Sequence, residues 1–341
     1  MKLLIFTQKL DKNDRTLGFF AEWVKHLSVS FEKISVVCLE KGDFDLPENV
    51  SVYSIGKEEG MGKLLYVVCF YKYLFDLRGK YDAVFVHMNE EYILLGGLFW
   101  KLARRPVFFW RNHSKGSAKT RLAVFLSKKV FCTAKDSFTA KFKKTILMPV
   151  GVDTDLFRED KNIFRNKNSV CMVGRIAPVK KIELCLQAVL ILIGRGVQVS
   201  LTVLGPCDKK NLNYFNFLKN FVLKNNLSPY VGFFDGVPPA ELPKIYNSRE
   251  ISVNLTASGS FDKTIVEAAA CGAAPLVSNK SLSGLLPDLC LTENDAEILA
   301  RSIQTLLRSE TRLKIENDLK NFAERNSLKN LTEKLVKEIK S

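Results

Sequence analysis

Residues 258–272 read SGSFDKTIVEAAACG, and this stretch decides the fold. A β-branched run at 251–255 precedes it and an apolar run at 274–277 follows, which predicts strand, loop, helix and strand. The loop then falls at the carboxyl end of the first strand, where ligands bind in open α/β sheets. Asp262 or Thr264 is placed to cap the helix, whose free N–H groups would offer an anion site.

The helix of this stretch carries a single carboxylate, Glu267, in its first turn or just past it, where it faces the contents of the loop. Three alanines at 268–270 predict a smooth helix that can lie close to its sheet. Gly272 predicts its end, because glycine readily adopts the left-handed conformation. An ordinary strand–helix–strand crossover with a polar loop remains an alternative interpretation of this stretch alone.

Strand-like and helix-length segments alternate along the whole chain, which favours parallel sheets covered by helices. The expected strands of the first half are residues 2–6, 33–39, 51–55, 82–87, 106–110 and 129–132. Those of the second half are residues 169–173, 198–204, 230–234, 251–255 and 274–277. Helices are expected at residues 17–27 and 182–193.

Residues 158–168 are polar and lack strand signals, which predicts a linker between two domains. We therefore expect an α/β protein with two Rossmann-like domains, residues 1–150 and 151–341, facing each other across a ligand-binding cleft. The C-terminal helices are free to pack back on the first domain.

The composition is that of a soluble globular protein, with 47% hydrophobic and 26% charged residues in 341. The apolar start at residues 1–6 ends in charged residues too early for a signal peptide, and no apolar run has membrane-spanning length. Eight cysteines without a CxxC pair or zinc spacing indicate core thiols in a reducing cytoplasm.

The net charge of +15 is concentrated in residues 61–150, where 12 Lys and 5 Arg oppose 5 acids and leave +12. Such a charge suits nucleic acid, an anionic membrane or an anionic substrate. No nucleic-acid motif is present, so we expect no nucleic-acid partner. Basic and large aromatic residues share one expected helix at 63–75, which favours contact with an anionic membrane surface. A solvated basic face over a core stripe is the alternative.

Motifs of the common nucleotide-binding and hydrolytic sites are absent: no GxGxxG follows the first strand, and no P-loop, HExxH or GxSxG occurs. Arg175 instead closes a strand, and Lys180 follows five residues later. On a strand-to-helix loop, this spacing lets a guanidinium and an ammonium converge on one phosphate group. Two solvated surface cations are the alternative.

Four residues of the first half end or follow expected strands and are therefore candidates for the edge of the cleft, His113 as a catalytic residue and His87, Asp11 and Asp14 on the acceptor side. His113 comes directly after the strand at 106–110, and His87 ends the strand at 82–87. Either imidazole can contact a substrate hydroxyl or phosphate. Asp11 and Asp14 lie in the loop after the first strand, where each can instead be a helix N-cap.

Residues 169–278 resemble the C-terminal domain of GT-B glycosyltransferases of the GT4, or glycosyl transferases group 1, type. Residues 149–157, PVGVDTDLF, look like the inter-domain PxGVDxxxF signature of that family. The residues that carry the resemblance are Val173-Gly174-Arg175 with Lys180, Val203-Leu204-Gly205, Phe234-Asp235-Gly236, Ile265-Val266-Glu267-Ala268 and Cys271-Gly272.

The resemblance implies roles for these residues. Arg175 and Lys180 match the pair that holds the donor diphosphate and stabilises the departing charge, which can replace a metal ion. Glu267 matches the carboxylate that binds the ribose hydroxyls, and His113 is similar to a histidine near the donor sugar. The other expected donor-binding residues are Gly174, Gly205, Gly236, Phe261, Asp262 and Lys263.

The chain departs from the family pattern in two places. Gly259 stands where the family has the first acid of its paired glutamates, and Ser260-Phe261-Asp262 replaces Gly-Phe-Gly. We expect Asp262, beside Lys263, to have taken over the acid. Lys181 stands where the family usually has glycine.

We therefore expect a glycosyltransferase that moves a sugar from a nucleotide-diphosphate sugar to a lipid-linked or polysaccharide acceptor. The resemblance implies retention of anomeric configuration, no bound metal and no cofactor. We further expect a cytoplasmic protein, peripheral at the inner face of the membrane, in cell-surface polysaccharide synthesis. A nucleotide-sugar epimerase of the same architecture would turn over the donor alone, and a non-catalytic nucleotide-sugar-binding module would bind it without turnover.

Overall fold

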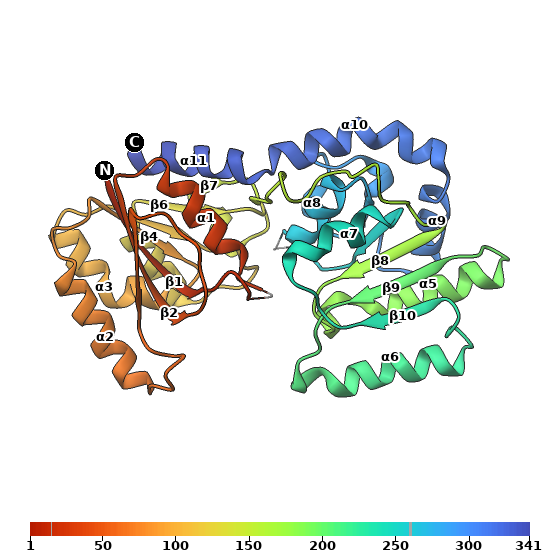
Figure 1. Cartoon of the computed structure of the whole chain (residues 1–341), viewed down its shortest axis with the longest axis horizontal. Coiled ribbons are helices and arrows are strands. Elements are labelled where there is room, and N and C mark those ends of the chain that lie inside the picture. Colours follow the sequence, from red (N-terminus) through yellow and green to blue (C-terminus); the bar gives the residue numbers. More distant parts are fainter. Residues whose placement is uncertain (15, 259–260) are drawn as a thin grey trace. The chain divides into compact units, whose positions relative to one another are not determined.

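The computed structural model describes residues 1–14, 16–258 and 261–341. The chain forms two compact units, one made of residues 1–151 and 328–341 and the other of residues 152–327. Each unit contains a parallel sheet with helices packed against it, so the α/β class with two Rossmann-like domains is confirmed (Figure 1). The helix at the C-terminus, residues 328–340, belongs to the first unit rather than to the second.

The first unit is built on a seven-stranded sheet of order β3-β2-β1-β4-β5-β6-β7 in which every pairing is parallel. Its strands are β1 (Lys2–Leu10), β2 (Lys33–Lys41), β3 (Val50–Ser54), β4 (Ala83–His87), β5 (Val107–Trp110), β6 (Lys129–Cys132) and β7 (Thr145–Leu147). The six strands expected in this half are confirmed within a few residues. The edge strand β7 was missed because three residues are too few to show an alternating pattern.

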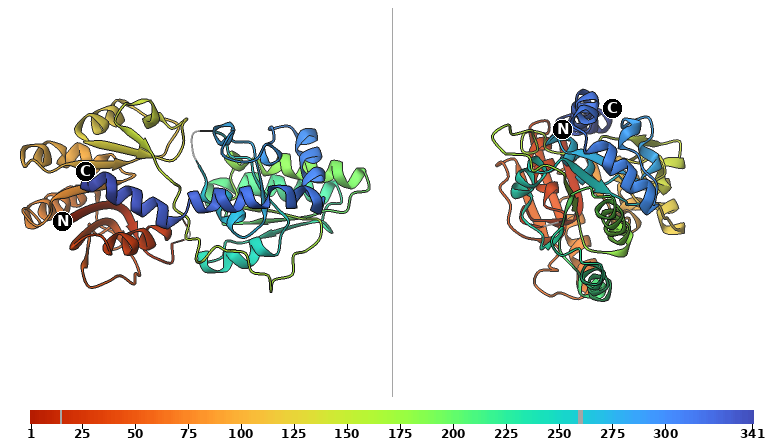
Figure 2. Two further views of the ribbon diagram at one scale, coloured as in Figure 1. Left: turned by 90° about the horizontal axis from the view of Figure 1, so that it is seen from above. Right: turned by 90° about the vertical axis from the view of Figure 1, so that its right-hand side faces the viewer.

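Helices cover both faces of the first sheet and create two cores. They are α1 (Phe19–Ser28), α2 (Lys63–Asp76), α3 (Glu91–Leu102), α4 (Ala118–Leu126) and α11 (Leu328–Lys340). On one face, α1 and α11 bury Trp23 and Leu331 against the sheet. On the other, α2, α3 and α4 bury Phe70, Trp100 and Val124. Figure 2 shows α11 lying along the first unit, beside α1.

The second unit contains a five-stranded parallel sheet of order β10-β9-β8-β11-β12. Its strands are β8 (Ser169–Val173), β9 (Ser200–Leu204), β10 (Val231–Phe234), β11 (Ile251–Asn254) and β12 (Ala274–Val277). Its helices are α5 (Ile182–Gly194), α6 (Leu212–Lys224), α7 (Leu242–Asn247), α8 (Lys263–Ala270), α9 (Ala296–Leu306) and α10 (Ser309–Arg325). The strand order reverses between β8 and β11, which is where open α/β sheets bind ligands.

The strand, loop, helix and strand predicted around residues 258–272 are confirmed as β11, α8 and β12. Gly272 has φ +76° and ends α8 in the left-handed conformation. The guanidinium of Arg165 donates hydrogen bonds to the carbonyl oxygens of Cys271, at 3.1 Å, and Gly272. These bonds satisfy carbonyls that a helix end leaves without partners.

Two expectations about the chain as a whole can be compared with the structure. The eight cysteines are free thiols and six of them are buried, as expected of core residues. Within the described ranges, no helix is both long and apolar enough to cross a membrane.

Lys181 precedes α5 in a left-handed conformation, with φ 50° and ψ 45°. This conformation costs a residue with a Cβ atom about 1–2 kcal/mol and costs glycine little. The position where the family usually has glycine is therefore a strained one in this chain.

We predict that Lys181→Gly raises the melting temperature of the second unit by about 2–4 °C, equivalent to up to about 1 kcal/mol. Lys181→Ala is the matched control, because alanine removes the charge and keeps the Cβ atom. Calorimetric melting of both variants measures the effect. An equal gain in both variants would show that charge, not backbone strain, is relieved.

Candidate functional site

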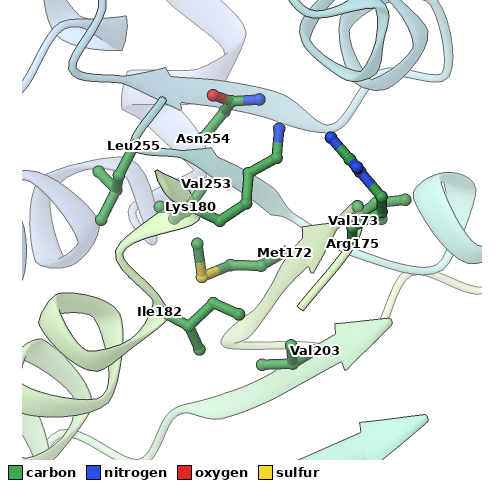
Figure 3. A pocket seen from close by; sticks show the side chains of 10 residues that line it. Met172, Val173, Arg175, Lys180, Ile182, Val203, Val253, Asn254 and Leu255 are labelled. Atoms are coloured by element: carbon green, nitrogen blue, oxygen red, sulfur yellow. The ribbon is translucent and has the colours of Figure 1, made fainter. Parts of the chain in front are cut away.

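A pocket lies at the carboxyl ends of β8 and β11, at the reversal point of the second sheet (Figure 3). The residues that line it are Met172, Val173, Gly174, Arg175, Lys180, Ile182, Val203, Val253, Asn254 and Leu255. Its floor is apolar, and its charged atoms belong to Arg175 and Lys180. Three of the residues expected to bind the donor, Gly174, Arg175 and Lys180, thus lie together here.

Glycine is required where β8 and β9 end, because the two backbones approach each other closely. Gly205 has φ +156°, and a Cβ atom on it would lie only 2.0 Å from the carbonyl oxygen of Gly174. Gly174 itself has φ +141°, and its N–H donates to the carbonyl of Leu204 at 2.9 Å. These two glycines shape the strand ends from which Arg175 projects.

The two cations of the pocket come from the same strand-to-helix loop. A short 3-10 turn, Pro178–Lys180, leads the chain back over the pocket after Arg175. Figure 3 shows the guanidinium of Arg175 and the ammonium of Lys180 pointing to the same side of the pocket. The Arg175 side chain is 53% exposed, with the carboxylate of Asp208 at 3.9 Å, so it is available to a ligand.

Lys180 is paired with Asp262. Its Nζ atom donates to Oδ2 of Asp262 at 2.5 Å and to Oγ1 of Thr256 at 3.1 Å. Asp262 Oδ2 also accepts from Asn254 Nδ2, at 3.0 Å, and from Thr256 Oγ1, at 2.9 Å. Burial acts to raise the pKa of Asp262, but the charge of Lys180 and these hydrogen bonds outweigh it and hold the pKa below its usual range.

Asp262 therefore differs from the expected helix cap. It occupies the N-cap position of α8 with an extended backbone, yet its side chain accepts no hydrogen bond from the helix amides. The nearby ammonium is a stronger partner for a carboxylate than a backbone amide is. Thr264, the other expected cap, accepts a hydrogen bond from Asn254 Nδ2 at 3.1 Å.

Glu267 lies one helical turn after Lys263 on α8. The hydroxyl of Tyr246, a buried residue of α7, donates to Oε2 of Glu267 at 3.2 Å. Burial raises the pKa of the Glu267 carboxyl, and the charge of Lys263 opposes this shift. Burial also lowers the pKa of Lys263, against the charges of Glu267 and Asp153. The protonation of Glu267 and that of Lys263 therefore depend on each other.

Sequence reasoning did not identify Asn254, Thr256 or Tyr246, which orient the carboxylates of this site. A signal for two of them existed, because Asn254 and Thr256 are polar residues at the carboxyl end of an otherwise apolar strand. Tyr246 had no such signal, because it reaches Glu267 from another helix and an aromatic residue there is typical of a core.

The expected donor-binding residues that are not among those lining the pocket are Gly205, Gly236, Phe261, Asp262, Lys263 and Glu267. The ring of Phe261 is 7% exposed and stacks on Phe322 of α10, with ring centroids 5.9 Å apart. Gly236 lies in the turn after β10, where its N–H donates to the Asp235 side chain at 2.7 Å. Gly259, where the family has an acid, lies outside the described residues.

The two aspartates of the acceptor side are engaged within the first unit. Lys9 Nζ lies 3.0 Å from Oδ2 of Asp14 and 3.5 Å from Oδ2 of Asp11. Asp14 Oδ1 accepts from the backbone N–H groups of Thr16 and Leu17, at 2.9 and 2.8 Å. Thr16 and Leu17 lie in the turn before α1, and the N-cap position of α1 is Gly18, so Asp14 orders this turn and is not the expected helix N-cap.

The two histidines of the acceptor side have opposite environments. His87 is 1% exposed, stacks on Phe20 at 4.0 Å and shares a hydrogen bond of 3.1 Å with the Thr7 hydroxyl. It is therefore a core residue beneath α1. His113 is exposed, and its Nδ1 lies 2.9 Å from the backbone nitrogen and 3.1 Å from the carbonyl oxygen of Lys115.

The pocket thus places two cationic side chains at a strand end of a Rossmann-like unit that follows another such unit. Across residues 1–14, 16–258 and 261–341 there is no group of three His, Cys, Asp or Glu side chains placed to hold a metal ion.

Comparison with known proteins identifies the class. HepE of Anabaena, crystallised with UDP, superposes with a TM-score of 0.80 at 17% identity, covering 100% of both chains. A glycosyltransferase from Rickettsia africae gives a TM-score of 0.76 at 14% identity, covering 100% of this chain and 99% of that one. The fold is thus that of GT-B glycosyltransferases.

Sequence comparison then gives the family. The description "Glycosyl transferases group 1" matches residues 153–326, so the chain belongs to this family and is a glycosyltransferase. A D-inositol 3-phosphate glycosyltransferase from Segniliparus rotundus is 28% identical over 151 residues. The match covers 42% of this chain, and this chain spans only 33% of the length of that relative.

The pairing of Lys180 with Asp262 generates a prediction about anion binding. We expect Asp262→Asn to bind inorganic pyrophosphate about 5- to 10-fold more tightly than the wild type, because the lysine charge is no longer compensated. Isothermal titration calorimetry measures the affinity. The control is Asp208→Asn, which removes a weaker and more exposed partner of Arg175. Equal or weaker pyrophosphate binding by Asp262→Asn would contradict the prediction.

Proposed function

We propose that this glycosyltransferase takes a glycosyl group from a nucleotide-diphosphate sugar bound at the pocket of the second unit. The observation that carries the proposal is the convergence of Arg175 and Lys180 at the reversal point of the sheet, with Glu267 on the adjoining α8. Two cations at one strand end suit a diphosphate. In support, the Anabaena protein of the same fold has been crystallised with UDP and with UDP-glucose.

The proposed chemistry is electrostatic stabilisation of the leaving group. As the bond between the sugar and the diphosphate breaks, negative charge grows on the phosphate oxygens. Arg175, with its planar fork, and Lys180, with its point charge, are placed to bind those oxygens and to lower the barrier. This supply of positive charge supports a reaction that needs no bound metal. Retention of anomeric configuration is proposed from the family resemblance alone.

The pairing of Asp262 with Lys180 adds a step to donor binding, because the family pattern has glycine at the position of Asp262. For Lys180 to bind a phosphate oxygen, its contact with the carboxylate has to be shared or exchanged. We assign the released Asp262, with Lys263, to the donor-sugar side of the site, and Glu267 to the ribose hydroxyls. A carboxylate that accepts from two hydroxyl groups suits a ribose diol.

We propose a lipid-linked or saccharide acceptor, on the first unit, in cell-surface polysaccharide synthesis at the inner face of the membrane. The basic charge of residues 61–150 supports an anionic acceptor or surface. His113 is the candidate that remains exposed there, whereas His87 is buried and Asp14 is bound to the turn before α1. Incubation with the donor alone distinguishes transfer from epimerisation, because an epimerase converts the donor sugar without an acceptor.

The first prediction from this proposal concerns the cations. Arg175→Ala and Lys180→Ala each lower the transfer rate at least about tenfold, because each removes one charge-assisted contact to the leaving group. A thermal-shift screen of nucleotide sugars first finds the donor, and initial rates are then compared. Lys181→Ala is the control for loss of a neighbouring charge. Rates near the wild type in both variants would contradict the diphosphate assignment.

The second prediction concerns Glu267. Glu267→Ala weakens the binding of UDP or GDP at least about tenfold, because the ribose hydroxyls lose their acceptor. Tyr246→Phe keeps the ring and removes one hydrogen bond to Glu267, so a smaller loss is expected. Calorimetric titration with UDP, GDP and inorganic pyrophosphate checks both variants. Nucleotide affinity unchanged by Glu267→Ala would refute the ribose role, whereas pyrophosphate affinity is expected to stay the same.

A further inference from the structure

Three helices of the first unit expose an unusual number of large apolar side chains. These are Leu64, Leu65, Val67, Val68 and Phe75 on α2, Leu98 and Leu102 on α3, and Leu122 and Phe125 on α4. Leu64 and Leu102 are 85% and 86% exposed, and Phe125 is 67% exposed. Single exposed apolar residues are ordinary, but a group of this size marks an interaction surface.

The three helices form one continuous surface, here called the α2–α4 surface. All three pack on the same face of the first sheet, through a shared core. Phe75 of α2 meets Phe99 of α3 edge-to-face at 5.6 Å, and Tyr71 donates to the Leu95 carbonyl at 3.2 Å. Lys101 of α3 lies over the Phe125 ring of α4 at 5.2 Å. Figure 1 shows α2 and α3 side by side.

Basic side chains accompany these apolar ones. Exposed lysines and arginines on the three helices and the turns after them are Lys63, Lys72, Arg78, Lys80, Lys101, Arg104, Lys119 and Arg121. Two of the acids within residues 61–150 are engaged by arginines, since Asp82 pairs with Arg105 and Glu90 with Arg111. The exposed acids on the same helices are Asp76 and Glu91, so the eight basic side chains leave this surface with a net positive charge.

We propose that the α2–α4 surface docks on an anionic lipid bilayer. Its leucine, valine and phenylalanine side chains would enter the outer acyl region, and its lysines and arginines would remain at the level of the headgroups. This inference deepens the proposed function by naming the partner of the acceptor-side unit. It does not depend on the identity of the donor or on the chemistry of the second unit.

The charge of the α2–α4 surface favours a bilayer over a second copy of the chain as its partner. A symmetric dimer through the α2–α4 surface would bring two strongly basic faces together and leave like charges opposed. An anionic bilayer instead supplies opposite charge to the basic residues and an apolar phase to the leucines and phenylalanines. The basic side chains then face opposite charge, and the apolar side chains are removed from water.

The test is co-sedimentation of the full chain with vesicles of phosphatidylglycerol and phosphatidylcholine, compared with phosphatidylcholine alone. We expect binding that requires the anionic lipid and weakens as salt is added. The triple variant Leu64→Ser, Leu102→Ser, Phe125→Ser should bind at least about tenfold more weakly at low salt. The control is Phe217→Ser, Leu223→Ser, Leu313→Ser, three exposed apolar residues on α6 and α10, and this variant should bind like the wild type.

A second variant separates the charge from the apolar contacts. Lys63→Glu with Lys101→Glu should lower binding at low salt and make the remaining binding less dependent on salt. Melting temperatures near that of the wild type check that all variants fold.

Three results would overturn the proposal. They are equal binding to neutral vesicles, equal losses in the two triple variants, or a dimer in light scattering that the first triple variant dissociates. The last result would identify a second copy as the occupant. Because vesicle binding needs neither donor nor acceptor, its failure can be told apart from a failure of the proposed transfer reaction.

Discussion

Reversal of strand order in a parallel sheet is the constraint on which the candidate site depends. In the second unit the chain runs outward from β8 in one direction and then resumes at β11 on its other side, so the loops after these strands diverge. A crevice is left between them, lined by apolar side chains such as Met172, Ile182 and Leu255. Gly174 and Gly205 let two strand ends approach so closely that a methyl group would not fit, and the charged loop follows directly.

Electrostatics within this crevice is organised around one carboxylate. Asp262 accepts hydrogen bonds from Lys180, which follows β8, and from Asn254 and Thr256 at the end of β11. It therefore links the segment after β8 to the segment after β11. At the position where the family pattern has glycine, this chain has the carboxylate of Asp262, which pairs with Lys180. The same residue thereby lowers the net charge of the pocket and holds its two loops in register, which links affinity for an anion to the order of the loops.

Sequence patterns predicted local structure well and long-range side-chain contacts poorly, for physical reasons. Both faces of a parallel strand are buried, so β11 and β12 could be recognised from the β-branched run at 251–255 and the apolar run at 274–277. The pairing of Lys180 with Asp262 joins residues 82 positions apart, and no local pattern encodes it. Phe261 and His87 were placed near ligands by their neighbours in sequence, but each is buried by an aromatic residue from a distant helix.

The return of α11 to the first unit has a consequence for biosynthesis. Its Leu331, Leu335 and Ile339 complete the core that contains Trp23, although more than 300 residues separate the two ends of that core along the chain. On the ribosome, residues 152–327 can assemble their own sheet while the earlier unit still waits for its last helix. The first unit, whose synthesis begins first, is thus completed last. Until then its helix α1 lacks the contacts that α11 later provides. Until α11 is synthesised, the core around Trp23 lacks the buried side chains of Leu331, Leu335 and Ile339.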